Sequence, residues 1–185
     1  MQGQLVRMFG ATALLGAALL PNSGSAQAAT PDSSVAMVGT TLISVHYVAP
    51  LVGGREVFGT AVPYNQTWRT GGGGEATTFR TLRPITMGDV TVPKGLYTMF
   101  TVPAPAEREC NGAAPAGSGM LILSRQSGGE LDASQEVARV PMRACQLEEA
   151  VERLAIRVIP GSGRTGTLRI EWERTRYDVP FSLAR

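Results

Sequence analysis

The stretch TLISVHYV at residues 41–48 alternates apolar and polar side chains along most of its length. In an extended chain Ile43, Val45 and Tyr47 lie on one face, because successive side chains of a strand point to opposite sides. The stretch LRIEWE at residues 168–173 repeats the same alternation. Both stretches therefore predict β-strands that bury one face in a core.

Other segments of the chain show short apolar or alternating runs that are bounded by turn residues such as Gly88-Asp89. We expect further strands at residues 35–38, 76–82, 85–87, 90–92, 96–102, 120–125, 137–142, 153–159 and 177–183. Pro180 should lie where no ladder hydrogen bond needs its missing N–H. Residues 146–153 are the only segment of the domain that suggests a helical turn. The spacing of the strands predicts an all-β fold, either an antiparallel β-sandwich or a flattened barrel.

The composition of the 185 residues bounds both the size of the protein and its class. The hydrophobic share of 43% supports one well-cored domain. The 17 basic and 15 acidic residues give a net charge of only +2, which is too low for a surface that binds nucleic acid. With one His and two Cys, the chain has too few ligands for a His-rich zinc site or an iron–sulfur cluster. We therefore expect neither a nucleic-acid partner nor a cofactor.

The first 28 residues differ in character from the rest of the chain. Arg7 precedes an apolar run at residues 8–20, and Ala26-Gln27-Ala28 has the A-x-A pattern of a signal-peptidase site. Residues 1–28 are thus a signal peptide or an uncleaved membrane anchor with an apolar N-terminal helix. Residues 29–185 would form an exported periplasmic β domain, which is membrane-associated if the N-terminal segment is not cleaved.

Two long connections and a cysteine pair complete the organisation of the domain. Residues 103–119 are rich in Pro, Ala and Gly, which predicts a mobile surface insertion. Residues 53–74 carry enough apolar side chains to predict a packed loop instead. Cys110 and Cys145 would meet an oxidising periplasm, where such a pair usually forms a disulfide; two free thiols are the alternative.

An ordered set of short motifs runs through the domain. They are VHY at 45–47, GREVFG at 54–59, VPY at 62–64, WRTG at 68–71, EAT at 75–77, PKGLY at 93–97 and FTVP at 100–103. This set resembles a family of secreted bacterial domains of unknown function. The resemblance implies a compact β domain of the cell envelope, without an established activity or cofactor. The chain departs from the family pattern at Ala49, Gly53 and residues 72–74, which indicates that any ligand site there is weakened.

The best candidate site is the loop around the WRTG motif, whose residues could bind a ligand or form an interface. These residues are Tyr64, Trp68, Arg69, Gly71 and Glu75. We expect Arg69 and Glu75 to pair across the base of a flexible glycine turn, although its N–H groups could instead bind an anion. We interpret Glu171 and Glu173 as residues of a solvated strand face.

His46 is the residue that an enzyme of this sequence would use as a general base. It stands on the Ser44 face of its strand, and the sequence offers no partner carboxylate or assignable nucleophile. The leading hypothesis is therefore a non-catalytic periplasmic accessory or structural subunit that binds a membrane protein complex. A bacterial photosynthetic reaction centre with its antenna is one such complex. The alternative is a small-ligand-binding or enzymatic envelope domain that uses residues 68–75 and His46.

Overall fold

The computed structural model describes residues 29–110 and 116–184. The expected N-terminal helix belongs to residues 1–28 and lies outside this part of the chain. The described residues form nine strands and a short 3-10 helix at Ala133–Gln135. The strands are β1 Thr30–Val38, β2 Thr41–Ala49, β3 Thr78–Thr81, β4 Ile85–Met87, β5 Val90–Val92, β6 Gly95–Val102, β7 Ala116–Ser124, β8 Glu136–Pro160 and β9 Thr165–Leu183.

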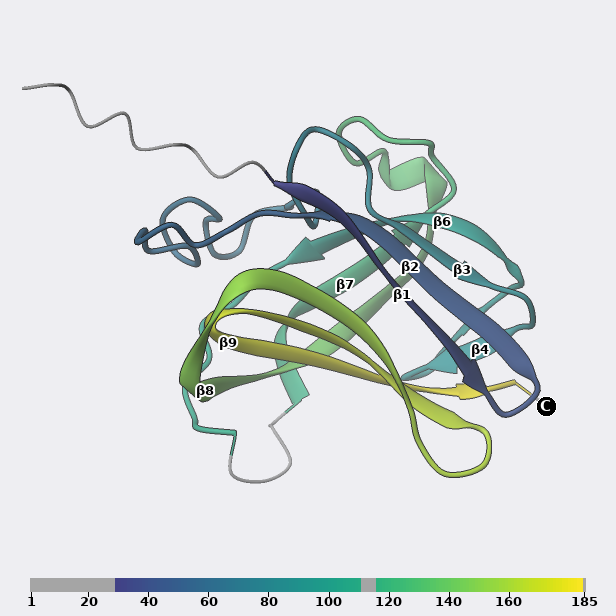
Figure 1. The fold of residues 1–185 in the computed structure, drawn as a ribbon. Coiled ribbons are helices and arrows are strands. Elements are labelled where there is room, and N and C mark those ends of the chain that lie inside the picture. The colour runs from purple at the N-terminus through teal and green to yellow at the C-terminus, as the bar shows by residue number, and fades with distance from the viewer. Residues whose placement is uncertain (1–28, 111–115, 185) are drawn as a thin grey trace, which may run out of the picture.

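All nine strands join one antiparallel sheet with the order β1-β2-β3-β6-β7-β8-β9-β4-β5. The sheet does not close by strand pairing. Instead it folds over, so that the long β8–β9 hairpin lies across β1 and β2 (Figure 1). The all-β antiparallel prediction is confirmed, and the arrangement is sandwich-like, whereas a closed barrel is wrong for the described strands.

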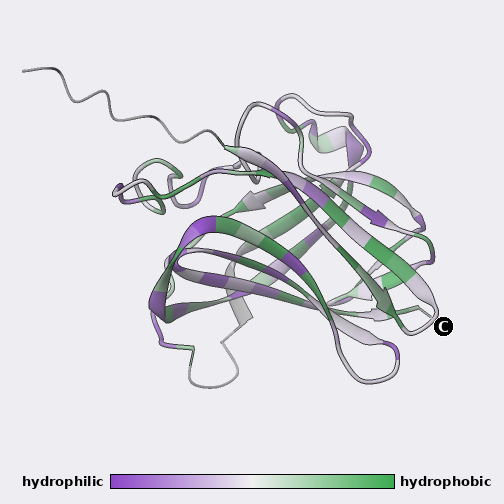
Figure 2. Ribbon diagram, viewed as in Figure 1, coloured by the Kyte–Doolittle hydropathy of each residue, from purple (hydrophilic) through white to green (hydrophobic). Residues whose placement is uncertain are grey.

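The core fills the space between the two parts of the folded sheet. Hydrophobic and hydrophilic residues alternate along the strands, as the sequence period requires (Figure 2). The predicted core side chains are all buried, and they are Ile43, Val45, Leu168, Ile170 and Trp172. The period of two thus assigned the inner face of both strands correctly.

The β8–β9 hairpin is longer and more bent than the sequence indicates. Residues 146–153 belong to β8, so the predicted helical turn is wrong. The pairing with β9 shifts register between Gln146 and Val151 and again between Val151 and Ala155. Such irregularities bend a strand and increase its twist. Here they accompany the bend of the hairpin over the core.

The connection between β6 and β7 is packed along its first part. Ala106 belongs to the core cluster, and the Ala104 carbonyl accepts a 2.7 Å hydrogen bond from the Tyr177 hydroxyl. A surface insertion over all of residues 103–119 is therefore wrong, and β7 already begins at Ala116. Residues 111–115 of the expected insertion lie outside the described part.

At Ile156 and Val158 of β8, side chains and not a backbone ladder make the hydrogen bonds to β1 and β2. The Ile156 N–H donates to the Tyr47 hydroxyl at 3.0 Å, and the Val158 N–H donates to the Ser34 hydroxyl at 2.9 Å. The Tyr47 hydroxyl in turn donates to an Asp32 carboxylate oxygen at 2.9 Å. These contacts form a hydroxyl seam that satisfies buried N–H groups without strand pairing.

The position of Pro180 follows the expectation for a proline in a strand. The last pair between β8 and β9 at this end joins Arg143 and Asp178, and the pairing of β9 with β4 begins only at Phe181. Pro180 is exposed between these two ladders. Its missing N–H therefore removes no ladder hydrogen bond from the sheet.

Candidate functional site

The candidate site is the long loop between β2 and β3, which is built on an aromatic cluster. The Phe58 ring meets the rings of Trp68, Trp172 and Tyr177 edge-on, with centroid distances of 6.0, 6.1 and 5.5 Å. The Trp68 and Trp172 rings stack at 6.0 Å. Edge-to-face and stacked pairs add to the stabilisation from burial alone. Residues 53–74 thus include a packed loop, as predicted.

Glu173 fastens this loop from the β9 side. One of its carboxylate oxygens accepts hydrogen bonds from the N–H groups of Val57 at 3.2 Å and Phe58 at 3.3 Å. Glu173 has a φ of 54°, a left-handed conformation that is uncommon for a residue with a side chain. The interpretation of Glu173 as a solvated strand residue is wrong, because the irregular β9 backbone directs its carboxylate to the loop.

Backbone hydrogen bonds hold the second half of the loop against β6. The Trp68 N–H donates to the Thr101 carbonyl at 2.7 Å, and the Thr101 N–H donates back to the Trp68 carbonyl at 3.0 Å. The Asn65 N–H donates to the Pro103 carbonyl at 2.8 Å. The backbone beside Trp68 is therefore fixed, while the Trp68 side chain itself remains half-buried.

The glycine stretch packs closely on the end of β2. The Gly72 N–H donates to the Val48 carbonyl at 3.0 Å, so it is not available to an anion. Gly71 has a φ of 113°, and a Cβ there would lie 2.8 Å from the Thr77 hydroxyl oxygen. Only glycine combines this backbone conformation with so close an approach. These contacts explain Gly71 and Gly72 as packing residues.

Arg69 and Glu75 lie on one hollow but do not pair. The hollow has a volume of about 260 Å³, and its other lining residues include Trp68, Gly71 and Glu130. The four ion pairs found among residues 29–110 and 116–184 do not include Arg69 or Glu75, and both side chains are exposed. The expected Arg69–Glu75 pair is therefore wrong.

His46 lies outside that hollow. It is exposed on β2 and lines a neighbouring depression of about 290 Å³ together with Asp32, Tyr47 and Glu75. Glu75 borders both depressions, whereas Arg69 and His46 each border one of these two. The residues proposed for catalysis thus adjoin each other at the surface without converging in one pocket.

The tyrosines around the loop do not ionise at neutral pH. Burial raises the pKa of Tyr64, and the Glu173 and Glu56 carboxylates add to the rise. Burial also raises the pKa of Tyr177 and raises that of Tyr47 to about 12. All three phenols therefore stay protonated and act here as hydrogen-bonding or packing groups.

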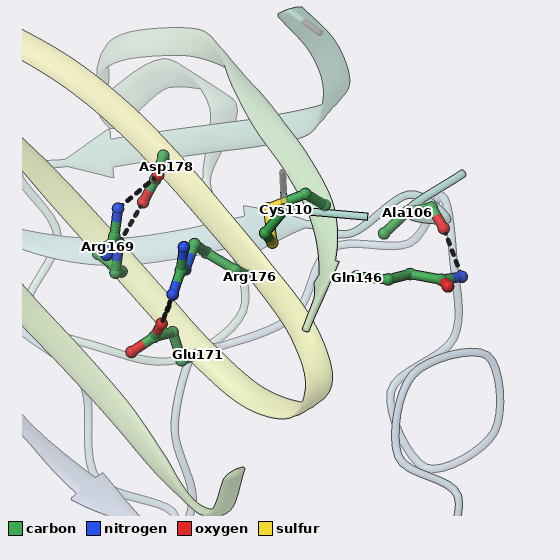
Figure 3. The surroundings of a disulfide bond; sticks show 8 residues. Ala106, Cys110, Gln146, Arg169, Glu171, Arg176 and Asp178 are labelled. Carbon is green, nitrogen blue, oxygen red and sulfur yellow. Dashed lines mark hydrogen bonds and ion pairs between the residues drawn. A yellow bond between two sulfur atoms is a disulfide. The ribbon is translucent and has the colours of Figure 1, made fainter. Parts of the chain in front are cut away.

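A disulfide joins Cys110 to Cys145, the pairing expected from the sequence. Beside it Gln146 donates from its side chain to the Ala106 carbonyl at 2.8 Å, which ties the same segment to β8 (Figure 3). A disulfide that closes a loop of this length stabilises a fold by about 3 to 4 kcal/mol in the chain-entropy model. The pair therefore anchors the connection between β6 and β7.

Glu171 lies near the disulfide and is also not solvated. It is 5% exposed, and it binds Arg176 at 2.7 Å and Arg157 at 3.0 Å (Figure 3 shows the Arg176 contact). A carboxylate so buried requires paired cations to offset its lost hydration. The sequence missed this arrangement, because alternation predicts that Glu171 faces away from the core but not what covers it.

The described residues contain no group of three or more His, Cys, Asp or Glu side chains placed to hold a metal ion. In the same part of the chain, no helix has the length and apolar character needed to cross a bilayer.

The fold and the site define a sandwich-like all-β domain that carries a long, fastened surface loop. The chain belongs to the family described as "Protein of unknown function (DUF2911)", whose model matches residues 30–181. This match agrees with the resemblance to domains of unknown function. No curated protein and no solved structure matches the chain.

Proposed function

We propose that this protein is a non-catalytic subunit of the bacterial cell envelope that binds a membrane protein complex through the loop at residues 53–75. The observation that carries the proposal is the fastening of this loop by Glu173 and the aromatic cluster. A surface that is fixed before binding loses less conformational entropy when it meets a partner. Such a loop is suited to recognition.

The side chains that the loop presents fit an interface. Tyr64 and Trp68 are half-buried with part of each ring accessible, and Arg69 is exposed. Tyrosine, tryptophan and arginine are enriched in protein interfaces and in their energetic centres. The separation of Arg69 and His46 between two depressions supports binding over catalysis.

Two features support an envelope location. The apolar segment with its A-x-A pattern at residues 26–28 is typical of export. The Cys110–Cys145 disulfide is typical of proteins in oxidising compartments. A photosynthetic reaction centre with its antenna stays a prediction for the particular complex.

The test is isolation of the full chain from its native membrane in mild detergent, followed by identification of the proteins that co-purify. We expect Arg69→Glu to lower recovery of the partner at least tenfold, because it reverses the charge at the centre of the loop. Arg143→Glu is the matched control, since Arg143 is exposed on β8 and lines neither of the two depressions. Equal recovery with both variants would overturn the proposal.

A second candidate function is small-ligand binding in the hollow beside Trp68. The hollow brings an aromatic ring, Arg69 and two carboxylates, Glu75 and Glu130, to one place. A screen of envelope metabolites by Trp fluorescence would test it. Saturable quenching that Arg69→Gln abolishes would favour this function over the protein interface.

A further inference from the structure

A different surface from the loop carries a further inference. It lies on the outer face of β1, β2, β3 and β6, which is the face turned away from the core. The large hydrophobic side chains that are exposed in the described residues all lie here: Val35 at 55%, Met37 at 55%, Leu82 at 46% and Leu96 at 61%. We call these four residues the bare end of the outer face.

The strand register brings the bare end together from three segments, which are β1, the residue after β3, and β6. Val35 pairs with Ser44, Ser44 with Arg80, and Arg80 with Leu96, so these residues form one row across the sheet. In the next row Met37 pairs with Leu42, and the Leu82 N–H donates to the Leu42 carbonyl. With strands about 4.8 Å apart, the first row spans about 14 Å. The two rows therefore place all four side chains on one stretch of the outer face, with Ser44 and Arg80 between Val35 and Leu96.

The charge at the bare end has one sign. Arg80 stands inside the first row, and Arg83 and Lys94 follow Leu82 and precede Leu96 along the chain. All three cations are exposed, and the ion pairs formed between described residues do not involve them. The outward positions of β1, β2, β3 and β6 within the described sheet hold no Asp or Glu.

We propose that the bare end, with Arg80, Arg83 and Lys94, is a docking surface for an anionic phospholipid membrane. A lipid surface offers negative headgroups above an apolar layer, so it accepts cations and aliphatic side chains together. A second copy of the chain fits less well, because face-to-face contact would bring two Arg80 side chains and their neighbouring cations together. The proposal does not rest on the function proposed for the loop.

Met37 provides a natural probe of this surface. An exposed thioether is oxidised by dilute peroxide to the sulfoxide, and mass spectrometry measures the rate at each methionine. The full chain would be oxidised in solution, on phosphatidylcholine vesicles and on vesicles containing about a third phosphatidylglycerol. Met120 on β7 is half-buried and lies outside the bare end, so it serves as the internal control.

We expect the oxidation of Met37 to slow at least fivefold on the anionic vesicles, with little change on phosphatidylcholine or at Met120. Each basic residue near an anionic surface strengthens binding about fivefold, so Arg80→Gln/Arg83→Gln/Lys94→Gln should weaken it about a hundredfold and abolish the protection. The matched control Arg108→Gln/Arg139→Gln/Arg143→Gln removes the same charge elsewhere and should keep it. Any contribution of residues 1–28 is common to all variants.

Several outcomes would overturn the proposal. The first is an oxidation rate of Met37 that does not change on anionic vesicles. Equal loss of protection in both triple variants would overturn it as well. A third is protection that depends on protein concentration without vesicles, which indicates a second copy. A fourth is protection in native membranes but not on vesicles, which indicates a membrane protein. Failure of the Arg69→Glu test would leave this result unaffected.

Discussion

The two ends of the outer face of β1, β2, β3 and β6 differ in how far their side chains are covered. At the end near β2's C-terminus, the glycine stretch lies on Val48, which is 7% exposed. At the other end Val35 is 55% exposed, although it belongs to the same face. The comparison shows that alternation places a side chain on a face, while a separate loop decides whether that side chain becomes core or surface.

We call the end of the outer face near Val48, where the glycine stretch lies, the covered end. The largest effect on stability should come from the aromatic cluster that supports this end. Phe58→Ala removes a buried ring and should lower the free energy of unfolding by about 3 to 5 kcal/mol. Leu96→Ala at the bare end is the comparison, and it should change stability by less than about 0.5 kcal/mol. Urea unfolding followed by Trp fluorescence measures both. Similar losses would show that the bare end is covered in solution.

The next effect concerns the fastening of the loop by Glu173. Glu173→Ala leaves the Val57 and Phe58 N–H groups without their acceptor and should cost about 2 to 3 kcal/mol. Glu173→Gln keeps an acceptor oxygen and should restore part of the loss. Hydrogen exchange at Val57 and Phe58 reports the loop directly. Unchanged exchange in Glu173→Ala would contradict the role assigned to the carboxylate.

The most direct comparison of the two ends uses one substitution at two sites. Val48→Ala should cost about 2 kcal/mol, because it removes buried methyl groups. Val35→Ala should leave stability within about 0.5 kcal/mol, because its side chain is exposed. Urea midpoints of the two variants at equal protein concentration provide the test. Equal midpoints would remove the distinction between the ends.

The smallest effect on stability should come from a substitution of Tyr47, which lies beneath the covered end. Tyr47→Phe leaves the Ile156 N–H without its acceptor and should cost about 1 to 1.5 kcal/mol. The folded pKa of Tyr47 is about 12, above the usual value of 10. Its protonated form therefore stabilises the fold fully below pH 10, and this contribution is lost as the pH rises through 12. Tyr47→Phe should reduce the loss of stability between pH 8 and 11, measured by urea unfolding.

Much of the fold could be predicted from side-chain period alone. Residues 41–48 and 168–173 alternate, so their inner faces followed directly. The bent part of β8 could not be predicted in the same way, because the register shifts interrupt its period and QLEEAVER at 146–153 also suits a helix. Alternation likewise predicts that glutamates on the outer face of a strand are solvated, because it does not show which neighbouring elements cover them.

The candidate site was predicted in its position and not in its contacts. The motifs placed Tyr64, Trp68 and Arg69 in one packed loop, yet nothing near Glu173 in the sequence signals its left-handed backbone. The bare end was missed for a related reason. Val35 and Met37 come from β1, Leu82 directly follows β3 and Leu96 comes from β6, and only the sheet register places these three segments side by side.

The hydroxyl seam between β1 and β8 has a consequence for the solubility of the protein. β1 is an edge strand of the sheet, and residues 155–160 of β8 pair with β9 on one side only. Unpaired edges invite another chain to add a strand. The Tyr47 and Ser34 hydroxyls accept hydrogen bonds from the Ile156 and Val158 N–H groups, so these groups are not available to a strand of another chain. The two hydroxyls therefore protect β8 from edge-to-edge aggregation.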